Sequence, residues 1–585
     1  MIRQKSNYDK FPSVTVDPQY DTCYFGWVDI SEHLNESLAG LGSGLHYLVI
    51  DCYNGIIEEE VQKSLRQRLQ YDKFIDTAAW MRPAAQIEAF FRDDVTDDEI
   101  FGYKTRYNME GYFDLTQINA LSSELSELDE GVVVVYGVGA ALVAPRIDLL
   151  VYADMARWEI QMRYRRNEAW NVGLTNQTER ASLKYKRAFF VDWRILDRHK
   201  KQFIDRWDYV LDTNRQNEPK MTTGDAVRNT LKQMVYQPFR VVPFFDPGPW
   251  GGQWMKEVCD LDKETINYAW CFDCVPEENS LLLKFSHALF EIPAIDLVFY
   301  QPHQLLGEAV YGQFGDEFPI RFDFLDTMGG GNLSLQVHPL TEYIQEQFGM
   351  NYTQDESYYI LDAEPGAFVY LGLKENVDKD AMMSELADSL KSGRFDAERH
   401  VGKYPVKKHD HMLIPAGTVH CSGKNSMVLE ISATPYIFTF KLWDWGRLGL
   451  DGRPRPIHIT HGCHSIQWDR TESWVKQNLV NQVKTIDSGD GWVEESTGLH
   501  AREFIETRRF WFSRKTTHRT THGVNVLNLV EGREVIVESP YDSFVPFVVH
   551  YAETFIVPAC VGDYTIRPYG ESEGRKCAVI KAFVR

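Results

Sequence analysis

Four side chains of the types that bind metals fall in the C-terminal half of this chain. Gln336 and His338 stand two residues apart in NLSLQVHPLTEYIQEQFG, and side chains two apart on a strand project to the same face. Glu356 lies in DESYYILDAEPGA, and His420 follows a Pro-Ala-Gly turn in IPAGTVHCSG. Two imidazoles, a carboxylate and an amide suit Zn²⁺ and leave space for water or a substrate. We therefore predict one metal site from these four residues.

The spacing of these residues requires a sheet to bring them together. His338 and Glu356 are 18 residues apart, and Glu356 and His420 are 64 apart, which is too far for one local loop but natural for neighbouring strands. From about residue 236 the strand-like runs are short, aromatic and separated by Gly and Pro, as in AFVYLGL and MVLEISAT. We expect antiparallel β structure here, a barrel or jelly roll.

The first 230 or so residues have a different pattern. Apolar runs such as GLHYLVIDC, GVVVVYGVGAALVA and IDLLVYADM alternate with helical segments such as IIEEEVQKSLRQRLQ and RWEIQMRYRRN. Continuous apolar strands between helices are typical of a parallel sheet covered on both faces. We therefore predict a multidomain chain in which residues 1–230 form an α/β domain.

This α/β pattern faintly resembles the nucleoside kinases that carry a phosphate-binding P-loop, in which an Asp-ended strand precedes an arginine-rich helix. Asp154 and the arginines between residues 157 and 166 occupy the corresponding places. The loop GxxxxGK[ST] is absent, because DCYNGIIEEEV provides neither its lysine nor its Ser or Thr. We expect a P-loop-like sheet without a phosphate-binding loop, in a structural or regulatory domain whose arginines are solvated or paired with carboxylates.

Composition limits the partners of the chain. The 585 residues include 84 acidic and 62 basic side chains, for a net charge of -22, so the protein as a whole repels nucleic acid and anionic membranes. The apolar run 132–144 is too short to cross a bilayer, and the first residues lack a signal-peptide core. We expect a cytoplasmic protein. Nine cysteines indicate reduced thiols, and Cys271 and Cys274 are interpreted as buried or incidental.

Several long motifs in order closely resemble type I mannose-6-phosphate isomerases, a zinc-dependent cupin family. The motifs are PWGGQWMKEV, LSLQVHP, DESYYILDAEPGA, IPAGTVHCSGKNSMVLEI and FTFKLWDWGRLGLDGRPRPIHI. Later runs, NVLNLVEGREVIVES and ETFIVPACVGDYTIRP, look like the second cupin repeat of that family. The resemblance implies a metal-binding cupin, a β jelly roll, over residues 236–465 and a second cupin over 466–585.

The resemblance carries the family's zinc ligands onto Gln336, His338, Glu356 and His420, with one Zn²⁺ per chain. Two positions depart from the family, which usually has lysine where this chain has Gln354 and arginine where it has Lys441. Because a positive charge is lost or altered, the phosphate anchor falls to Lys441 or Arg447, with Lys408 a weaker candidate. Ser334 could add a hydrogen bond to the substrate, and no residue is assigned as the base.

Two hypotheses for function remain. One is a zinc-dependent aldose-ketose isomerase that interconverts mannose 6-phosphate and fructose 6-phosphate, or a related sugar phosphate, through an enediolate. The alternative is a catalytically inactive regulatory protein that binds a metal and a sugar phosphate. The intact ligand set favours the isomerase, whereas Gln354 and Lys441 favour the alternative.

Overall fold

The computed structural model of the protein describes residues 5–435, 437–498 and 503–585. The chain divides into two compact units. The α/β unit contains Ser13–Gln233 and Ser280–Tyr300. The β unit contains the residues up to Pro12, then Met234–Asn279 and Gln301–Arg585. The segment Ser280–Tyr300 therefore leaves the β part of the sequence and folds with the N-terminal part, which the residue patterns did not indicate.

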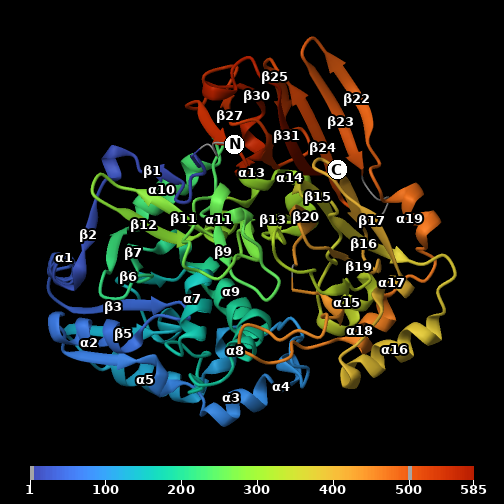
Figure 1. Ribbon diagram of the computed structural model, residues 1–585. Helices are drawn as coiled ribbons and strands as arrows, with labels where there is room; N and C mark the ends of the chain where they lie inside the picture. Colours follow the sequence, from blue (N-terminus) through green and yellow to red (C-terminus); the bar gives the residue numbers. More distant parts are fainter. Residues whose placement is uncertain (1–4, 436, 499–502) are drawn as a thin grey trace. The chain divides into compact units, whose positions relative to one another are not determined.

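A seven-stranded sheet forms the centre of the α/β unit (Figure 1). Its strands in spatial order are β2 (Cys23–Phe25), β8 (Lys220–Thr223), β7 (Tyr209–Asp212), β6 (Leu149–Asp154), β3 (Leu45–Cys52), β5 (Gly131–Gly137) and β4 (Lys73–Asp76). The strands from β7 to β4 are parallel, and β8 and β2 add an antiparallel edge. Every residue of β6 is buried, as expected for a parallel strand covered on both faces.

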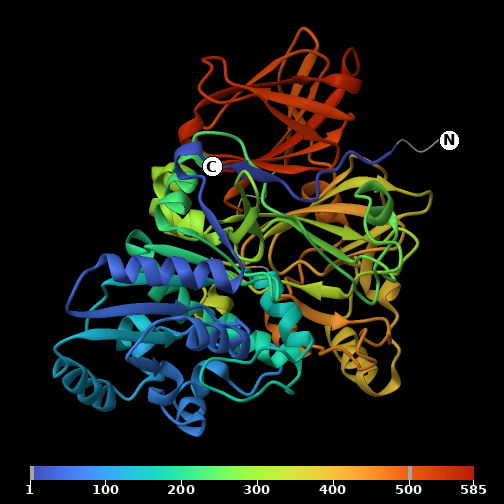
Figure 2. The same ribbon diagram turned by 90° about the vertical axis from the view of Figure 1, so that its left-hand side faces the viewer.

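Helices flank this sheet (Figure 2). They are α1 (Gly26–Gly40), α2 (Glu58–Arg68), α3 (Ala84–Phe90), α4 (Arg92–Val95), α5 (Leu115–Ser126), α6 (Ala140–Val143), α7 (Arg157–Arg165), α8 (Ala181–Arg187), α9 (Trp193–Phe203), α10 (Gly224–Met234) and α12 (Ile295–Tyr300). Helix α2 begins with three consecutive glutamates, which the partial positive charge of a helix N-terminus stabilises. The predicted alternation of strands and helices is confirmed.

The segment Ser280–Tyr300 joins the α/β unit through backbone and charge. Its strand β11 (Ser280–Lys284) pairs in parallel with β1 (Ser13–Thr15) and antiparallel with β12 (Leu289–Pro293). The Nζ of Lys200 lies 2.8 Å from a carboxylate oxygen of Asp154 and 2.8 Å from one of Asp296 in α12. All three side chains are almost fully buried, so the lysine compensates two carboxylates in the core.

The first half of the β unit contains two antiparallel sheets. The six-stranded sheet consists of β18 (His411–Ile414), β15 (Glu356–Ala363), β20 (Ser426–Ala433), β13 (Ile320–Asp326), β10 (Trp270–Cys274) and β9 (Phe244–Asp246). The five-stranded sheet consists of β17 (Val401–Pro405), β16 (Phe368–Leu373), β19 (His420–Ser422), β14 (Leu335–Val337) and β21 (Phe440–Trp443). These strands agree with the expectation of antiparallel β structure.

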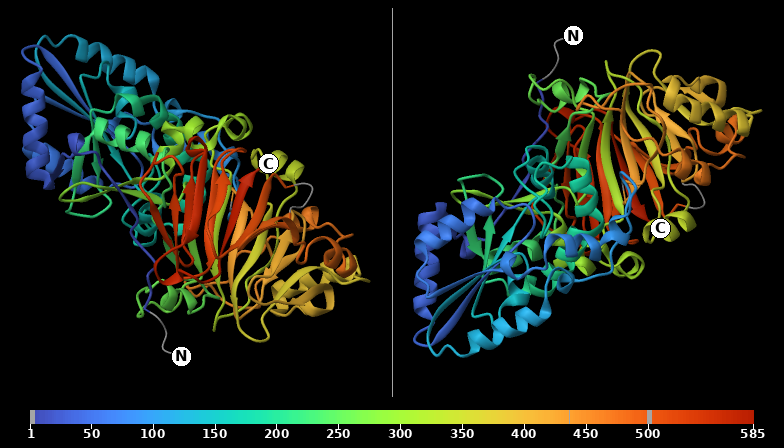
Figure 3. Two further views of the ribbon diagram at one scale, coloured as in Figure 1. Left: turned by 90° about the horizontal axis from the view of Figure 1, so that it is seen from above. Right: turned by 90° about the horizontal axis from the view of Figure 1, so that it is seen from below.

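The second half of the β unit also has two sheets, and its strands lie beside those of the first half (Figure 3). Their strands are β22 (Lys484–Gly489), β23 (Trp492–Gly498), β24 (Ile505–Phe512), β31 (Cys577–Val584), β26 (Asn525–Glu531) and β29 (Thr554–Val557) in one sheet, and β25 (Thr516–Arg519), β30 (Asp563–Pro568), β27 (Glu534–Glu538) and β28 (Phe547–His550) in the other. Apolar side chains from both sheets, such as Phe512, Leu529 and Val537, pack into one core.

Short helices complete the β unit: α11 (Trp254–Val258), α13 (Pro302–Leu306), α14 (Glu308–Phe314), α15 (Thr341–Phe348), α16 (Lys379–Ser392), α17 (Ala397–His400), α18 (Ile459–Ser465) and α19 (Glu472–Asn478).

A histidine links the two halves of the β unit, because His409 lies 2.9 Å from the hydroxyl of Tyr359 and 3.1 Å from a carboxylate oxygen of Glu531. Among the described residues, no helix combines the length and apolarity needed to cross a membrane.

Replacing Lys200 with methionine should destabilise the α/β unit. The change leaves two buried carboxylates without their cation, which costs about 3–5 kcal/mol of unfolding free energy. Urea denaturation followed by circular dichroism measures this loss. The matched control is Lys63→Met on the exposed side of α2, where we expect a change within about 0.5 kcal/mol. Equal stability of the two variants would contradict the prediction.

Candidate metal centre

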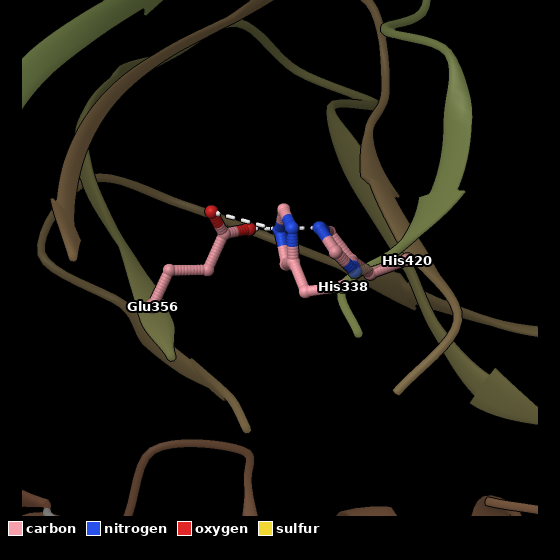
Figure 4. Close-up of side chains that lie close together, drawn as sticks. All are labelled: His338, Glu356 and His420. Atoms are coloured by element: carbon pink, nitrogen blue, oxygen red, sulfur yellow. Dashed lines mark ion pairs between the residues drawn. The ribbon is translucent and has the colours of Figure 1, made fainter. Parts of the chain in front are cut away.

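Three predicted ligands converge inside the first half of the β unit. One ligand atom each from His338, Glu356 and His420 all lie within 4.8 Å of one another, and the three residues are buried. The carboxylate of Glu356 faces both imidazoles from one side, at 3.2 Å from Nε2 of His338 and 2.7 Å from Nε2 of His420 (Figure 4). Adjacent ligands of a tetrahedral zinc ion lie about 3.3 Å apart, so the spacing fits such an ion.

The three side chains come from the two sheets of this half. Glu356 is the first residue of β15 in the six-stranded sheet, and His420 is the first of β19 in the five-stranded sheet. His338 directly follows β14, the neighbour of β19. Because the carboxylate and imidazoles meet, the interior faces of the two sheets face each other at this point. The fourth predicted residue, Gln336, pairs directly with His420, and its Nε2 lies 3.2 Å from Nε2 of His420.

Backbone carbonyl groups orient both imidazoles. Nδ1 of His338 lies 3.0 Å from the carbonyl oxygen of Phe438, and Nδ1 of His420 lies 2.8 Å from that of Thr418. A carbonyl only accepts, so each Nδ1 carries the proton and donates it. In the neutral ring each Nε2 is then unprotonated and offers its lone pair to a metal ion, which is the usual arrangement of metal-binding histidines; without a metal, a ring protonated at Nε2 donates to Glu356 instead.

The carboxylate of Glu356 is suited to remain ionised. Burial alone would raise its pKa, but the positive charges of His338 and His420 in their protonated form, with the hydrogen bonds they then donate, outweigh burial and hold the pKa well below its usual range. Among the described residues, Nε2 of His338 makes no hydrogen bond although it is fully buried. A buried acceptor without a donor is costly unless another partner occupies its lone pair. Two nitrogen donors, a carboxylate and an adjacent amide therefore fit a metal ion.

A charged network that the sequence did not reveal lies behind Glu356. Gln354, which stands where the resembling family has lysine, donates from Nε2 to Glu356 at 3.0 Å and to Glu430 at 3.3 Å. Arg321 forms ion pairs with Glu430 and, at 3.1 Å, with Asp323. Burial raises the pKa of Asp323 to about 7, a range suited to proton transfer near neutral pH. Only the register of β13, β15 and β20 brings these residues together.

Lys441 faces the same interior as the metal ligands. It is the direct cross-strand partner of Gln336, which in turn pairs with His420, so the three side chains project from one face of the sheet. Burial, followed by the charge of nearby Arg455, lowers the pKa of Lys441 to about 8. The lysine thus remains mainly charged at neutral pH and loses its charge in mild alkali.

The second predicted anchor, Arg447, belongs to a cluster around Asp444. The carboxylate of Asp444 accepts hydrogen bonds from Arg447 at 2.7 Å, from Arg455 at 2.6 Å and from the Ser334 hydroxyl at 2.9 Å. Burial opposes the charge of Asp444, but the two arginines lower its pKa overall. Lys441, Arg447 and Arg455 carry three positive charges against one on Asp444, which leaves two for an anion. Asp444 and Arg455 lie in the same recognised motif as Arg447, FTFKLWDWGRLGLDGRPRPIHI, but were not predicted from the sequence as site residues.

Other predicted residues lie outside this centre. Lys408 pairs with Glu531 at 2.6 Å and so anchors the contact between halves. Cys271 and Cys274 are buried free thiols in β10, as interpreted. In the α/β unit, the arginines of α7 are paired as expected: Arg157 with Asp197, and Arg163 with Glu159 at 3.0 Å.

Comparisons with known proteins give one match for the N-terminal part of the chain and different matches that cover more than half of it. Residues 26–236 match a protein family described as a domain of unknown function, DUF8485. The chain is 25% identical over 342 residues to mannose-6-phosphate isomerase ManA of Bacillus subtilis, covering 58% of this chain and 96% of the relative. It is 28% identical over 212 residues to mannose-6-phosphate isomerase of Streptococcus mutans, covering 36% and 61% respectively. The predicted similarity to these isomerases is confirmed, and the likeness to nucleoside kinases stays a prediction.

Solved structures of the same enzymes are also similar to this chain. A crystal structure of mannose 6-phosphate isomerase from Bacillus subtilis superposes with a TM-score of 0.48 at 20% identity and covers 59% of this chain and 99% of that chain. A zinc-bound mannose 6-phosphate isomerase gives a TM-score of 0.44 at 14% identity, with 59% and 99% covered.

Removing one imidazole should abolish metal retention. We expect the purified protein to retain about one zinc per chain after dialysis, and His338→Ala to retain almost none, because two ligands remain from the buried set of three. Elemental analysis by mass spectrometry gives the zinc content. His303→Ala, which removes an exposed histidine elsewhere in the β unit, should retain the metal. Equal zinc content in both variants would exclude this centre.

Proposed function

We propose that the protein is a zinc-dependent aldose-ketose isomerase that interconverts mannose 6-phosphate and fructose 6-phosphate. The observation that carries the proposal is the buried convergence of His338, Glu356 and His420 beside Gln336. The similarity to mannose-6-phosphate isomerases supports the same substrate. Gln336 would complete the ligand set with its amide oxygen, and the site would hold one zinc ion per chain.

The reaction moves a proton between adjacent carbons of the sugar and passes through an enediolate. A zinc ion held by these residues would supply Lewis-acid stabilisation of the negative charge on the sugar oxygen. Lys441 and Arg447 bind the phosphate, together with Arg455, because their excess of two positive charges matches a phosphate dianion. Ser334 holds Asp444 in place, and Asp444 orients both arginines. Asp323, with its pKa of about 7, provides an exchangeable proton on the interior network.

One observation favours the alternative, a catalytically inactive regulatory protein that binds the metal and a sugar phosphate. Gln354 replaces the lysine of the resembling family, and its amide is committed to Glu356 and Glu430. A neutral amide cannot stabilise the charge of an enediolate as an ammonium group would. The alternative predicts binding of the sugar phosphate without turnover.

A coupled assay of fructose 6-phosphate formation decides between these functions. We expect zinc-loaded protein to convert mannose 6-phosphate, and activity to disappear with a chelator and return with zinc. His338→Ala should stay inactive when zinc is added, whereas His303→Ala should behave like the unmodified protein. Absence of turnover by zinc-loaded protein that still binds mannose 6-phosphate in calorimetry would establish the regulatory function instead.

The pKa of Lys441 predicts how substrate binding depends on pH. Because the pKa is lowered to about 8, the positive charge is present below that value and lost above it. The phosphate of the substrate is already a dianion above pH 7, so KM should rise about tenfold or more between pH 7 and 9.5. Lys441→Arg keeps its charge over this range and should show a flat KM.

Lys441→Met is the control for this pH profile. It lacks the charge at every pH, so its KM should be high and constant while zinc content is unchanged. Steady-state kinetics of all three proteins between pH 6.5 and 9.5 provide the comparison. The same alkaline rise in Lys441→Arg would assign the pH dependence to another group.

A further inference from the structure

The α/β unit contains a cavity that the proposed isomerase reaction does not use. Its volume is about 470 Å³, within the roughly 300–1,000 Å³ range of small-molecule sites. Cys52, Asp76 and Gly137, the last residues of β3, β4 and β5, all line it. Ligands of open α/β sheets bind outside the carboxyl ends of parallel strands, so the cavity lies where this architecture places a ligand.

Polar groups without protein partners are gathered in this cavity. The hydroxyl of Tyr136, a residue only 2% exposed, has no oxygen or nitrogen partner among the described residues and only the Cys52 thiol, a weak hydrogen-bonding group, beside it. The buried Nε of Arg82 also has none within the part of the chain that the structure describes. Buried polar groups normally find partners, so these two atoms indicate a missing ligand.

Other polar residues of the lining are committed to the protein itself. Asn54 donates to the carbonyl of Trp170 and accepts from Tyr164, and the Thr77 hydroxyl donates to the carbonyl of Val138. Lining side chains still available to a ligand include Glu58, Arg82 through its Nε, and Tyr136, with Thr175 and Gln177 as further polar groups. The first three offer a carboxylate acceptor, a guanidinium donor and a phenol that can do both.

The charges of the cavity select against anions. Glu58 and Asp76 provide two carboxylates against the single cation Arg82. Desolvation, with the nearby charge of Asp76, raises the pKa of Glu58 to about 7 although part of the side chain is exposed, so the carboxyl is about half ionised at neutral pH and repels anions most strongly above pH 7. Glu58 also begins α2, at the helix N-terminus where a phosphate would otherwise bind. A phosphorylated ligand would meet repulsion at this end of the cavity.

The remaining lining suits a flat, hydroxyl-rich ring. Tyr53, Tyr136 and Trp170 contribute aromatic walls, against which the C–H face of a sugar ring can pack. A hydroxyl group donates to the carboxylate of Glu58 and accepts from Arg82, and a neighbouring hydroxyl can use Tyr136. We propose that this cavity binds a small neutral molecule with adjacent ring hydroxyls, provided by a free sugar or by a nucleoside.

Calorimetric titration of the full-length protein tests the proposal with three probes. D-mannose represents a free sugar, adenosine represents a nucleoside, and adenosine triphosphate is the anionic counterpart. We expect saturable binding of at least one neutral probe and weaker binding of the triphosphate than of adenosine. Binding of mannose alone or of adenosine alone identifies the source of the hydroxyls. No binding of either neutral probe at 10 mM, or tighter binding of the triphosphate, would overturn the proposal.

Variants show whether the bound probe occupies this cavity. Tyr136→Phe removes only the unpartnered hydroxyl and should weaken binding about three- to tenfold. Glu58→Gln keeps the shape and should weaken it tenfold or more, whereas Glu59→Gln, outside the cavity lining, should leave it unchanged. Thermal melting confirms that each variant is folded. Unchanged binding in both Tyr136→Phe and Glu58→Gln would place the probe elsewhere and refute the site.

Discussion

The candidate metal centre depends on one ionised carboxylate in a dry interior. Glu356 is 1% exposed, and a buried carboxylate without compensation costs several kcal/mol or takes up a proton. Compensation comes from His338 and His420, which reach the carboxylate only because two sheets hold their strands face to face. The carbonyls that accept from each Nδ1 fix the rings in turn. Strand register, ring tautomer and carboxylate charge are therefore parts of a single arrangement.

The two halves of the β unit each contain two antiparallel sheets, but the side chains between those sheets differ. In the first half, charged and amide side chains such as Arg321, Gln354 and Glu430 face inward and satisfy one another. In the second half, the space between the sheets is filled mainly by apolar side chains, including Phe512, Leu529 and Val537. The buried His518 beside this core packs against Phe510 and Tyr564 and hydrogen-bonds Thr516, and it belongs to no group of three metal-ligand side chains in the part of the chain that the structure describes. Among the described residues, the single cluster with metal-ligand geometry accordingly lies in the first half.

The sequence singled out the residues that converge in this centre because their signal is local. Gln336 and His338 stand two apart on a strand, and Glu356 and His420 lie in long recognisable motifs. Asp444 and Arg455 also lie in a recognised motif, but their contact was not predictable, because the two residues are 11 apart across an irregular loop. Likewise, the hairpin of β11 and β12 could be read as strands, but its pairing with β1, more than 260 residues earlier, depends on tertiary structure. Residue spacing predicts which side chains share one face of a helix or strand. Which side chains meet across a loop or between distant strands depends on the tertiary structure.

Charge separates the two sites of this chain. With a net charge of -22, the protein repels anions at long range, so a phosphorylated substrate needs a local excess of cations. The β unit provides one, since Asp444 neutralises only one of Lys441, Arg447 and Arg455. In the α/β unit the local charge is negative instead, so the cavity repels anions. Glu58 places a carboxylate at a helix N-terminus that would otherwise attract phosphate, and Asp76 adds a second at the end of β4. Under the two proposals, one chain combines a site suited to anions with a cavity that disfavours them, so a phosphorylated and an unphosphorylated ligand bind at different places.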